Sequence, residues 1–227
     1  MSLIYKKFVE EELDSNGNLL SIKFNPPENF NFAYDVVDVL GDKIPDKKAM
    51  VWVSIDHKNK NFTFKDMKIY SSKTANYFKS LGIVKGDKVM LILKRNYQFW
   101  FAVNALHKIG AVVVPATHLL TKKDLVYRFN AAGIKAVICT NEETILSSVE
   151  EALPESPTVK ILSVTEGVRE NWSCFNDGVE SADSTFPRPA DCNTNNDIMI
   201  MYFTSGTTGY PKIVCHNFTY PLGHIVT

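Results

Sequence analysis

The sequence of 227 residues lacks several features that mark special classes of protein. It has no excess of one charge, because 25 lysines and arginines balance 25 aspartates and glutamates. No overall basic field therefore exists to attract nucleic acid or an anionic membrane, and any anion must bind at a local site. Its apolar runs, such as those at 111–114 and 198–203, fall far short of the ~20 residues that span a bilayer. We expect no nucleic-acid partner and no membrane span.

Cysteine is scarce, and no targeting segment is evident. The four cysteines form no CxxC pair, so neither a zinc site nor a disulfide framework is indicated, and we expect free thiols. The first residues show no apolar core followed by a small-residue cleavage site, and the acidic run at 10–12 argues against a transit peptide. These features predict a cytoplasmic location.

Helical apolar stripes alternate with short continuous apolar runs between residues 67 and 139. The stripes predict helices, the continuous runs predict strands buried on both faces, and each helix is expected to end at a glycine. Thr121 with Asp124 predicts a capping box at the third helix. This alternation is typical of an α/β fold with a parallel sheet flanked by helices. The expected helices are 67–81 before Gly82, 96–109 before Gly110 and 121–132 before Gly133, and the expected strands are 89–93, 111–114 and 135–139.

Composition divides the chain into three parts. Residues 1–29 are polar and end in Asn-Pro-Pro-Glu-Asn, which predicts an N-terminal arm. Residues 30–180 form the predicted α/β subdomain, with one more helix and strand at 145–153 and 159–164. Residues 181–197 are rich in Ser, Asp, Asn and Pro, which predicts a long surface connection. We therefore expect 181–227 to comprise this linker and the start of a second subdomain.

A loop rich in hydroxyls and glycine follows the apolar run 198–203. Its sequence, TSGTTGYPK at 204–212, precedes a second apolar run at 213–215. Glycines let successive N–H groups point inward, hydroxyls add donors, and Lys212 adds a positive charge. Such a loop is suited to binding polyphosphate, although a hairpin turn that binds nothing has a similar composition. It is not a Walker loop, because GxxxxGK[ST] is absent and a strand is expected after Lys212.

The string SGTTGYPK, preceded by Tyr202, Phe203 and Thr204, resembles the phosphate-binding signature of the adenylate-forming superfamily. Two further stretches, LGIVKGDKVMLILKRN at 81–96 and KIGAVVVPATHLLTKKDLVYRF at 108–129, resemble the N-terminal domain of the same superfamily. The resemblance covers most of the chain from about Phe30. It is strongest to medium-chain acyl-CoA synthetases, with acetyl-CoA synthetases as near relatives. It implies the amino-terminal portion of the large domain of an adenylate-forming enzyme.

This resemblance implies an AMP-forming acid–thiol ligase of fatty acid metabolism. Such an enzyme uses ATP to convert a carboxylic acid, here expected to be a medium-chain fatty acid, to an acyl-adenylate, and then transfers the acyl group to coenzyme A. ATP, magnesium, coenzyme A and the acid are its implied small-molecule partners. Lys212 and Thr207 are the implied catalytic residues. The residues implied to wrap the β and γ phosphates are Thr204, Ser205, Gly206, Thr207, Thr208, Gly209 and Lys212, with Tyr210 and Pro211 shaping the loop.

The sequence ends at Thr227, before the adenine pocket, the acidic magnesium ligand and the late lysine that the resemblance implies. We therefore expect a fragment with no synthetase activity of its own and no metal ligand, whose uncovered strands favour self-association. Two alternatives stay open. The longer protein could be an acetyl- or propionyl-CoA synthetase, or this chain could be a non-catalytic nucleotide-binding module.

Four other polar residues are further candidates. Asp197 closes an Asn-rich turn and is expected to be a local cap. His216 and His224 are eight residues apart without a third ligand, so packing or surface roles are expected. His118 follows a predicted strand at the end where α/β folds place ligands, although a loop histidine without a function fits the same pattern.

Overall fold

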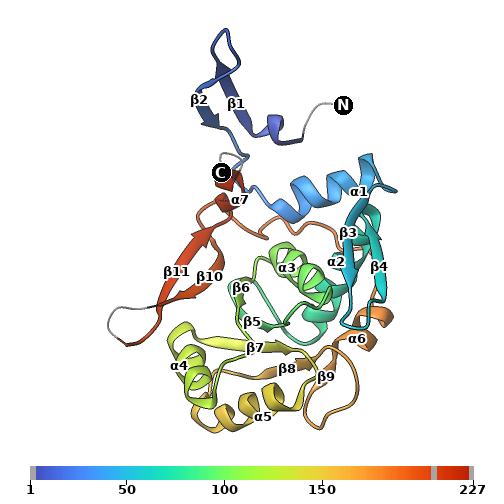
Figure 1. Ribbon diagram of the computed structural model, residues 1–227, viewed down its shortest axis with the longest axis vertical. Coiled ribbons are helices and arrows are strands. Elements are labelled where there is room, and N and C mark those ends of the chain that lie inside the picture. Colours follow the sequence, from blue (N-terminus) through green and yellow to red (C-terminus); the bar gives the residue numbers. More distant parts are fainter. Residues whose placement is uncertain (1–3, 206–208, 225–227) are drawn as a thin grey trace.

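A computed structural model describes residues 4–205 and 209–224 of the chain. At its centre lies a seven-stranded sheet with the strand order β11-β10-β6-β5-β7-β8-β9 (Figure 1). Neighbouring strands are parallel except β10 and β11, which are antiparallel. The predicted parallel α/β fold is confirmed. The strands are β5 (Lys88–Ile92), β6 (Val112–Pro115), β7 (Ile134–Cys139), β8 (Ile161–Val164), β9 (Ser173–Cys174), β10 (Ile198–Thr204) and β11 (Lys212–Asn217).

Helices cover both faces of this sheet, and each group of helices shares its own apolar core with the sheet. None of the described helices is long and apolar enough to cross a membrane. One group consists of α2 (Phe64–Ser80), α3 (Gln98–Ile109) and α6 (Phe175–Ser181), and the other of α4 (Lys122–Ala132) and α5 (Glu143–Ala152).

Strand β5 shows why its sequence is a continuous apolar run. Successive side chains of a strand point to opposite faces of the sheet. Val89 and Leu91 belong to the core under α2 and α3, whereas Met90 and Ile92 belong to the core under α4 and α5. All four side chains are buried. A strand covered on both faces needs apolar residues at every position, as the sequence predicted.

The three glycines predicted to end helices do so. Gly82, Gly110 and Gly133 have φ values of 87°, 80° and 63°, in the left-handed region that favours glycine. The Thr121 capping box is also confirmed, since the Thr121 side chain accepts the Asp124 N–H and the Asp124 carboxylate accepts the Thr121 N–H.

The apolar face of α3 differs from the prediction. The spacing of Phe99, Val103 and Leu106 along the sequence predicts one buried stripe, but Phe99 and Val103 are only partly buried. Phe101 and Ala102 are buried instead, as is Leu106. The reason is that α3 packs against α2 as well as the sheet, so more than one stripe of the helix is covered.

The predicted N-terminal arm contains regular structure that its polar composition did not indicate. A short helix, η1 (Ile4–Lys7), precedes an antiparallel hairpin of β1 (Val9–Leu13) and β2 (Leu19–Phe24), which projects from the body (Figure 1). Phe8 and Val9 are buried in one cluster with Phe30 and Leu222. This cluster joins the arm to the C-terminal end of the described chain.

The sequence predicted no individual helix or strand in the segment between the arm and α2. Its first helical piece is anchored in the core, because Asp38 pairs with the fully buried Lys108 of α3 at 2.9 Å. The elements of this segment are η2 (Ala33–Asp38), α1 (Val39–Lys43) and the antiparallel hairpin of β3 (Lys48–Val53) and β4 (Asn59–Thr63), and two further short helices elsewhere are η3 (Leu153–Glu155) and α7 (Tyr220–Gly223).

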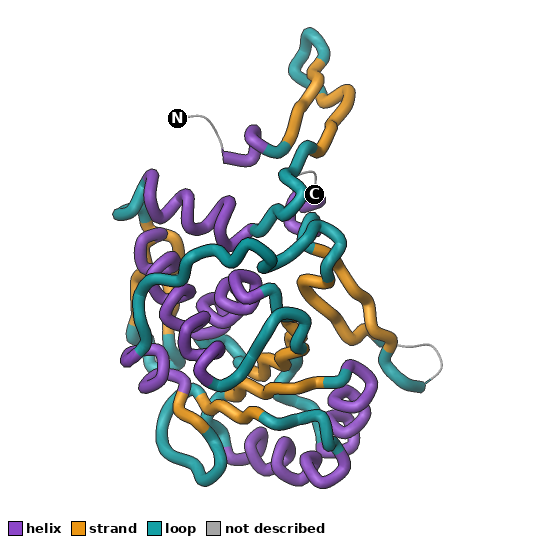
Figure 2. The backbone as a smooth tube through the Cα atoms, turned by 180° about the vertical axis from the view of Figure 1, so that it is seen from behind, coloured by secondary structure: helices purple, strands orange, loops and turns teal. Residues whose placement is uncertain are grey.

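The connection 181–197 is not wholly on the surface, which corrects the prediction. It is the long teal segment between α6 and β10 in Figure 2. Near its end Cys192 and Asn193 are buried. The Asn193 side chain donates to the Phe30 carbonyl at 2.9 Å and accepts from Asn31 Nδ2 at 2.9 Å. The segment packs because these amides satisfy backbone and side-chain groups that burial would otherwise leave unpaired.

The sheet continues across the boundary that we placed at residue 181. The parallel partner of β10 is β6, through the pair Ile200 and Val113, so β10 and β11 extend the sheet formed by residues 88–174. The division into an arm, a subdomain and the start of a second subdomain stays a prediction.

Candidate phosphate-binding site

The hydroxyl-rich loop connects two paired strands. Strands β10 and β11 run antiparallel, with Thr204 opposite Lys212 at the end nearest the loop. Met199, Ile200 and Met201 of β10 are buried. The predicted arrangement, a loop between two strands, is confirmed. Among the predicted site residues, Gly206, Thr207 and Thr208 lie outside the described residues.

The described loop residues display polar groups and one cation. Thr204, Ser205, Gly209 and Lys212 are exposed, and Thr204 Oγ1 donates to the Lys212 carbonyl at 3.4 Å. Within the described chain, Lys212 has no carboxylate within ion-pair distance. Gly209 has a φ of 96°, which only glycine adopts without strain. Hydroxyls and an unengaged ammonium group suit an incoming phosphate.

Helix α4 supports the far side of the loop. The Tyr127 hydroxyl donates to the Pro211 carbonyl at 2.8 Å, and the Tyr127 and Tyr210 rings lie 4.8 Å apart. Sequence reasoning did not single out Tyr127, although it lies within the LVYRF stretch that carried the family resemblance. A groove of about 470 Å³ runs between α4 and the loop, lined by Thr121, Lys123, Asp124, Tyr127, Gly209, Tyr210 and Pro211.

The Asp124 carboxylate, which lines this groove, is already engaged. Hydrogen bonds from the Thr121 side chain and backbone lower the pKa of Asp124, and Arg128 Nη1 lies 3.4 Å from its Oδ1. The described residues contain no group of three His, Cys, Asp or Glu placed to hold a metal ion. Magnesium prefers carboxylate and phosphate oxygens. The described residues of the loop offer hydroxyls and an ammonium group rather than these carboxylates.

The other polar candidates have structural partners. Asp197 accepts the Thr194 N–H at 2.8 Å and pairs with Lys85 at 3.0 Å, which confirms its role as a local cap. The ring of His216 stacks on Tyr220 at 3.9 Å, and His224 lies 4.6 Å from the same ring. Aromatic packing therefore accounts for both of these histidines.

His118 lies where the sequence placed it, at the carboxyl end of the parallel strands. It lines a cleft of about 770 Å³ beside residues that follow β5 and β6. In this cleft the Lys94 ammonium group forms an ion pair with the Glu142 carboxylate at 2.6 Å. Arg95 has no ion-pair partner in the described part of the chain. Clefts at this edge of α/β sheets commonly bind ligands, which keeps His118 a candidate.

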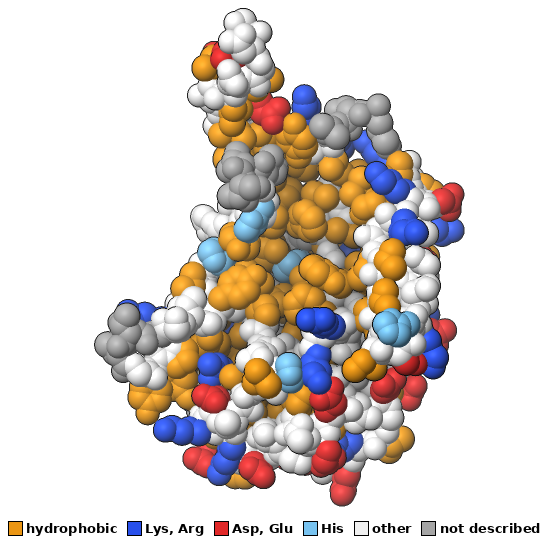
Figure 3. All heavy atoms as spheres, viewed as in Figure 1, with side chains coloured by type: hydrophobic (Ala, Val, Ile, Leu, Met, Phe, Trp, Pro, Cys, Tyr) orange, Lys and Arg blue, Asp and Glu red, His pale blue; other side chains and the backbone are white. Residues whose placement is uncertain are grey.

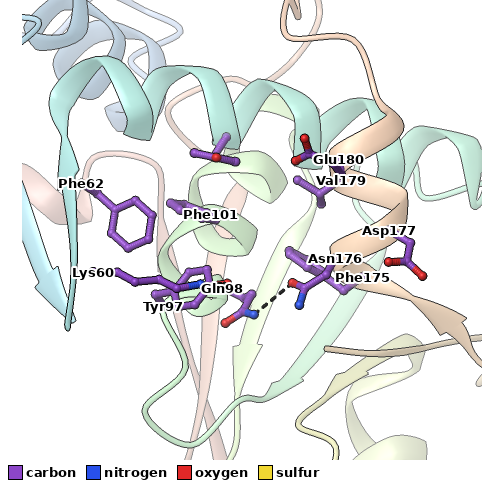
Figure 4. A pocket seen from close by; sticks show the side chains of 11 residues that line it. Lys60, Phe62, Tyr97, Gln98, Phe101, Phe175, Asn176, Asp177, Val179 and Glu180 are labelled. Carbon is purple, nitrogen blue, oxygen red and sulfur yellow. Dashed lines mark hydrogen bonds between the residues drawn. The ribbon is translucent and has the colours of Figure 1, made fainter. Parts of the chain in front are cut away.

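A separate cavity of about 440 Å³ lies between β4, α2, α3 and α6 (Figure 4). The stacked rings of Tyr70 and Phe101 are part of its aromatic wall, and Gln98 Nε2 donates to Asn176 Oδ1 at 3.0 Å on another side. Its lining shares no residue with the groove beside the loop, and none of the predicted site residues lines it.

Comparison with protein families shows the family to which the chain belongs. The family model described as AMP-binding enzyme matches residues 39–223. The chain belongs to this family. The match includes the sheet, the helices on both of its faces and the loop between β10 and β11.

The relatives within the AMP-binding enzymes are acyl-CoA synthetases. The chain is 32% identical over 201 residues to acyl-coenzyme A synthetase ACSM3 of Pongo abelii and 33% identical over 210 residues to ACSM5 of Rattus norvegicus. These alignments cover 86% and 88% of this chain, but 34% and 36% of the relatives. The chain thus spans about a third of the length of these curated relatives, and the resemblance to the acyl-CoA synthetase branch is confirmed.

Solved structures agree with this assignment. The anthranilate CoA ligase AuaEII, in complex with anthranoyl-AMP, superposes with a TM-score of 0.73 at 25% identity over 86% of this chain and 36% of its own. The acyl-CoA synthetase of Brucella canis gives a TM-score of 0.75 at 23% identity over 88% of this chain and 35% of its own, which supports the fold alone.

The predicted cytoplasmic location is wrong on this comparison. The relatives from Pongo abelii, Rattus norvegicus and Homo sapiens are named as mitochondrial. The prediction depended on the lack of an apolar core with a cleavage site and on the acidic run at 10–12. The acidic residues lie in β1, where they pair with β2. The run is part of a folded hairpin, and its charge therefore gives no information about targeting.

Proposed function

We propose that this chain is the amino-terminal part of an AMP-forming acyl-CoA synthetase. The longer protein would use ATP to activate a carboxylic acid and then transfer the acyl group to coenzyme A. The observation that carries the proposal is the pair of strand ends beside the loop, where Thr204, Ser205 and Lys212 are exposed and Lys212 has no ion-pair partner among the described residues. Family membership and the acyl-CoA synthetases among its relatives support the same reaction.

The loop would act in the first half-reaction. Hydroxyls and backbone N–H groups would hold the β and γ phosphates of ATP, and Lys212 would neutralise charge on the departing pyrophosphate. The acid carboxylate attacks the α phosphate, pyrophosphate leaves, and the thiol of coenzyme A then attacks the acyl-adenylate carbonyl to release AMP. A magnesium ion on the phosphates would add charge stabilisation. The proposed phosphate contacts are Thr204, Ser205, Gly206, Thr207, Thr208, Gly209 and Lys212, with Tyr210 and Pro211 shaping the loop.

A medium-chain fatty acid is the proposed substrate, because FNFAYDVVDVL at 30–40 and PATHLLTKKDLVYRF at 115–129 resemble that branch most. We infer a mitochondrial location from the relatives, and fractionation of cells that produce the full-length protein tests it. Preference for acetate or propionate over octanoate would assign the protein to the short-chain branch instead.

The decisive experiment is acid-dependent exchange of pyrophosphate into ATP by the full-length protein, with octanoate as the acid. We expect exchange by the wild type and an approximately hundredfold loss in Lys212→Met, since removal of one charge-stabilising group typically has that effect. Lys160→Met is the matched control, because Lys160 is exposed and lies far from the loop. It directly precedes β8, whereas the loop joins β10 and β11 at the other end of the strand order. The same rate in both variants would contradict the assignment of Lys212.

The 227-residue chain is expected to show no exchange when purified alone. Binding of ATP to this chain without any turnover, in a protein that proves to have no further domains, would favour the non-catalytic module. Exchange by the isolated chain would show that the expectation of inactivity is wrong.

A further inference from the structure

The side chain of Tyr127 contacts residues near both ends of the loop. Tyr127, in the middle of α4, donates its hydroxyl proton to the Pro211 carbonyl at 2.8 Å. Its ring lies 4.8 Å from Tyr210 with an interplanar angle of 33°, and 6.4 Å from Phe203 of β10 at 65°. Phe203, which precedes the loop, is thus joined through a single ring to Tyr210 and Pro211 within the loop.

The neighbouring residue strengthens this contact. The Arg128 guanidinium lies 5.3 Å from the Phe203 ring centre, a cation–π distance. Arg128 is itself held by the first turn of α4, because its Nη1 donates to the Asp124 carbonyl at 3.1 Å. Two consecutive residues of one helix therefore contact the hairpin that carries the loop.

Helix α4 is a rigid support for these contacts. Its first turn is closed by the capping box of Thr121 and Asp124, and Leu125 and Phe129 are buried against the sheet. Residues 209–211 lack comparable support. In the described part of the chain, the Tyr127 hydroxyl provides the one hydrogen bond that joins them to another element.

We propose that Tyr127 is a positioning residue for the phosphate-binding loop. It fixes the segment from Gly209 to Pro211 before nucleotide binds, so that Lys212, the next residue, is already beside the phosphate site. A loop ordered in advance loses less conformational entropy on binding and therefore binds ATP more tightly. This inference rests on the proposed function of the loop.

The test compares Tyr127→Phe with the wild type in the full-length protein. Removal of one hydroxyl while the ring is kept should raise the KM for ATP about fivefold, the effect expected from one hydrogen bond. The KM for the acid and the thermal midpoint should stay unchanged, and kcat should change less than the KM for ATP. A merely structural role would instead lower the thermal midpoint and affect both substrates alike.

Tyr5→Phe is the matched control, because it also removes one hydroxyl hydrogen bond, to Glu11 at 3.2 Å, far along the chain from the loop. A KM for ATP in Tyr127→Phe that equals the value in Tyr5→Phe would overturn the proposal.

Hydrogen–deuterium exchange of residues 209–212 separates this inference from the proposed function, because it needs no activity. We expect faster exchange there in Tyr127→Phe than in Tyr5→Phe. If the wild type catalyses no pyrophosphate exchange but deuterium uptake still rises, the proposed function fails and the positioning of the loop stands. Unchanged uptake would show that Tyr127 does not hold the loop.

Discussion

His107 is a buried titratable residue whose environment has a direct consequence for stability. It lies near the end of α3, is almost fully buried, and neither ring nitrogen has a hydrogen-bond partner among the described residues. Burial lowers the pKa of His107 from 6.5 to about 3. The folded protein therefore keeps this ring neutral at pH values where the unfolded chain protonates it.

This difference predicts acid sensitivity. Between pH 6.5 and pH 3 the unfolded state binds a proton at His107 that the folded state does not, so the free energy of unfolding falls as the pH falls. From pH 7 to pH 5 the contribution is about 2 kcal/mol. Urea denaturation at both values should show a smaller loss in His107→Gln than in the wild type. An equal loss in the two proteins would contradict the role of His107.

Gly110 combines two requirements at one position. Its φ of 80° favours glycine, and a Cβ there would overlap the carbonyl oxygen of Cys192. Gly110→Ala should therefore lower the free energy of unfolding by about 2 to 4 kcal/mol, since strain and displacement of the connection add together. Gly133 has a φ of 63°, and a Cβ there would meet no atom within 4 Å. Gly133→Ala therefore measures the backbone strain alone, which should lower the free energy of unfolding by about 1 kcal/mol. Equal losses in urea denaturation would show that the contact with Cys192 is unimportant.

At the scale of elements, α4 differs from the other helices in its contact with the loop. Thr121→Ala removes its capping box, and Thr63→Ala removes the equivalent box of α2. Each should lower stability by about 1 kcal/mol. If α4 orders the loop, Thr121→Ala alone should also raise the KM for ATP. A similar KM in both variants, measured by pyrophosphate exchange, would show that fraying of α4 does not reach the site.

The elements that the sequence predicted correctly are those whose signals are local. Helices α2 to α5 carry apolar periodicity and strand β5 is a continuous apolar run, and the glycines that end three helices need only a positive φ. The hairpins β1–β2 and β3–β4 escaped prediction because their strands are mostly exposed and carry no such pattern. Their positions depend on distant partners, such as Phe30 and Leu222 for the first hairpin.

The candidate site also combines features that the local sequence predicts with contacts between distant residues that it does not. The loop between two strands and its exposed Lys212 follow from the order of residues along the chain. Tyr127 lies 84 residues from Pro211, so no local pattern could reveal their hydrogen bond. The buried amides that hold the connection 181–197 are equally remote, since Asn193 bonds to residues 30 and 31.

At the scale of the whole molecule, apolar side chains gather on one concave face beside β10 and β11 (Figure 3). Ile198 of β10 and Val214 of β11 are partly exposed, and β11 is the edge strand of the seven-stranded sheet. Exposed apolar surface next to an edge strand favours association, because a second chain can cover the surface and pair with the strand.

The 227-residue chain should therefore associate with itself as its concentration rises, with β11 at the contact. Sedimentation velocity over a concentration series should show a shift to larger species in the wild type and a weaker shift in Val214→Lys, because a charge at the edge opposes pairing. Val168→Lys is the matched control, since Val168 is fully exposed on a loop far from β11. A monomer at all concentrations would contradict the prediction, and an equal effect of both lysines would place the contact elsewhere.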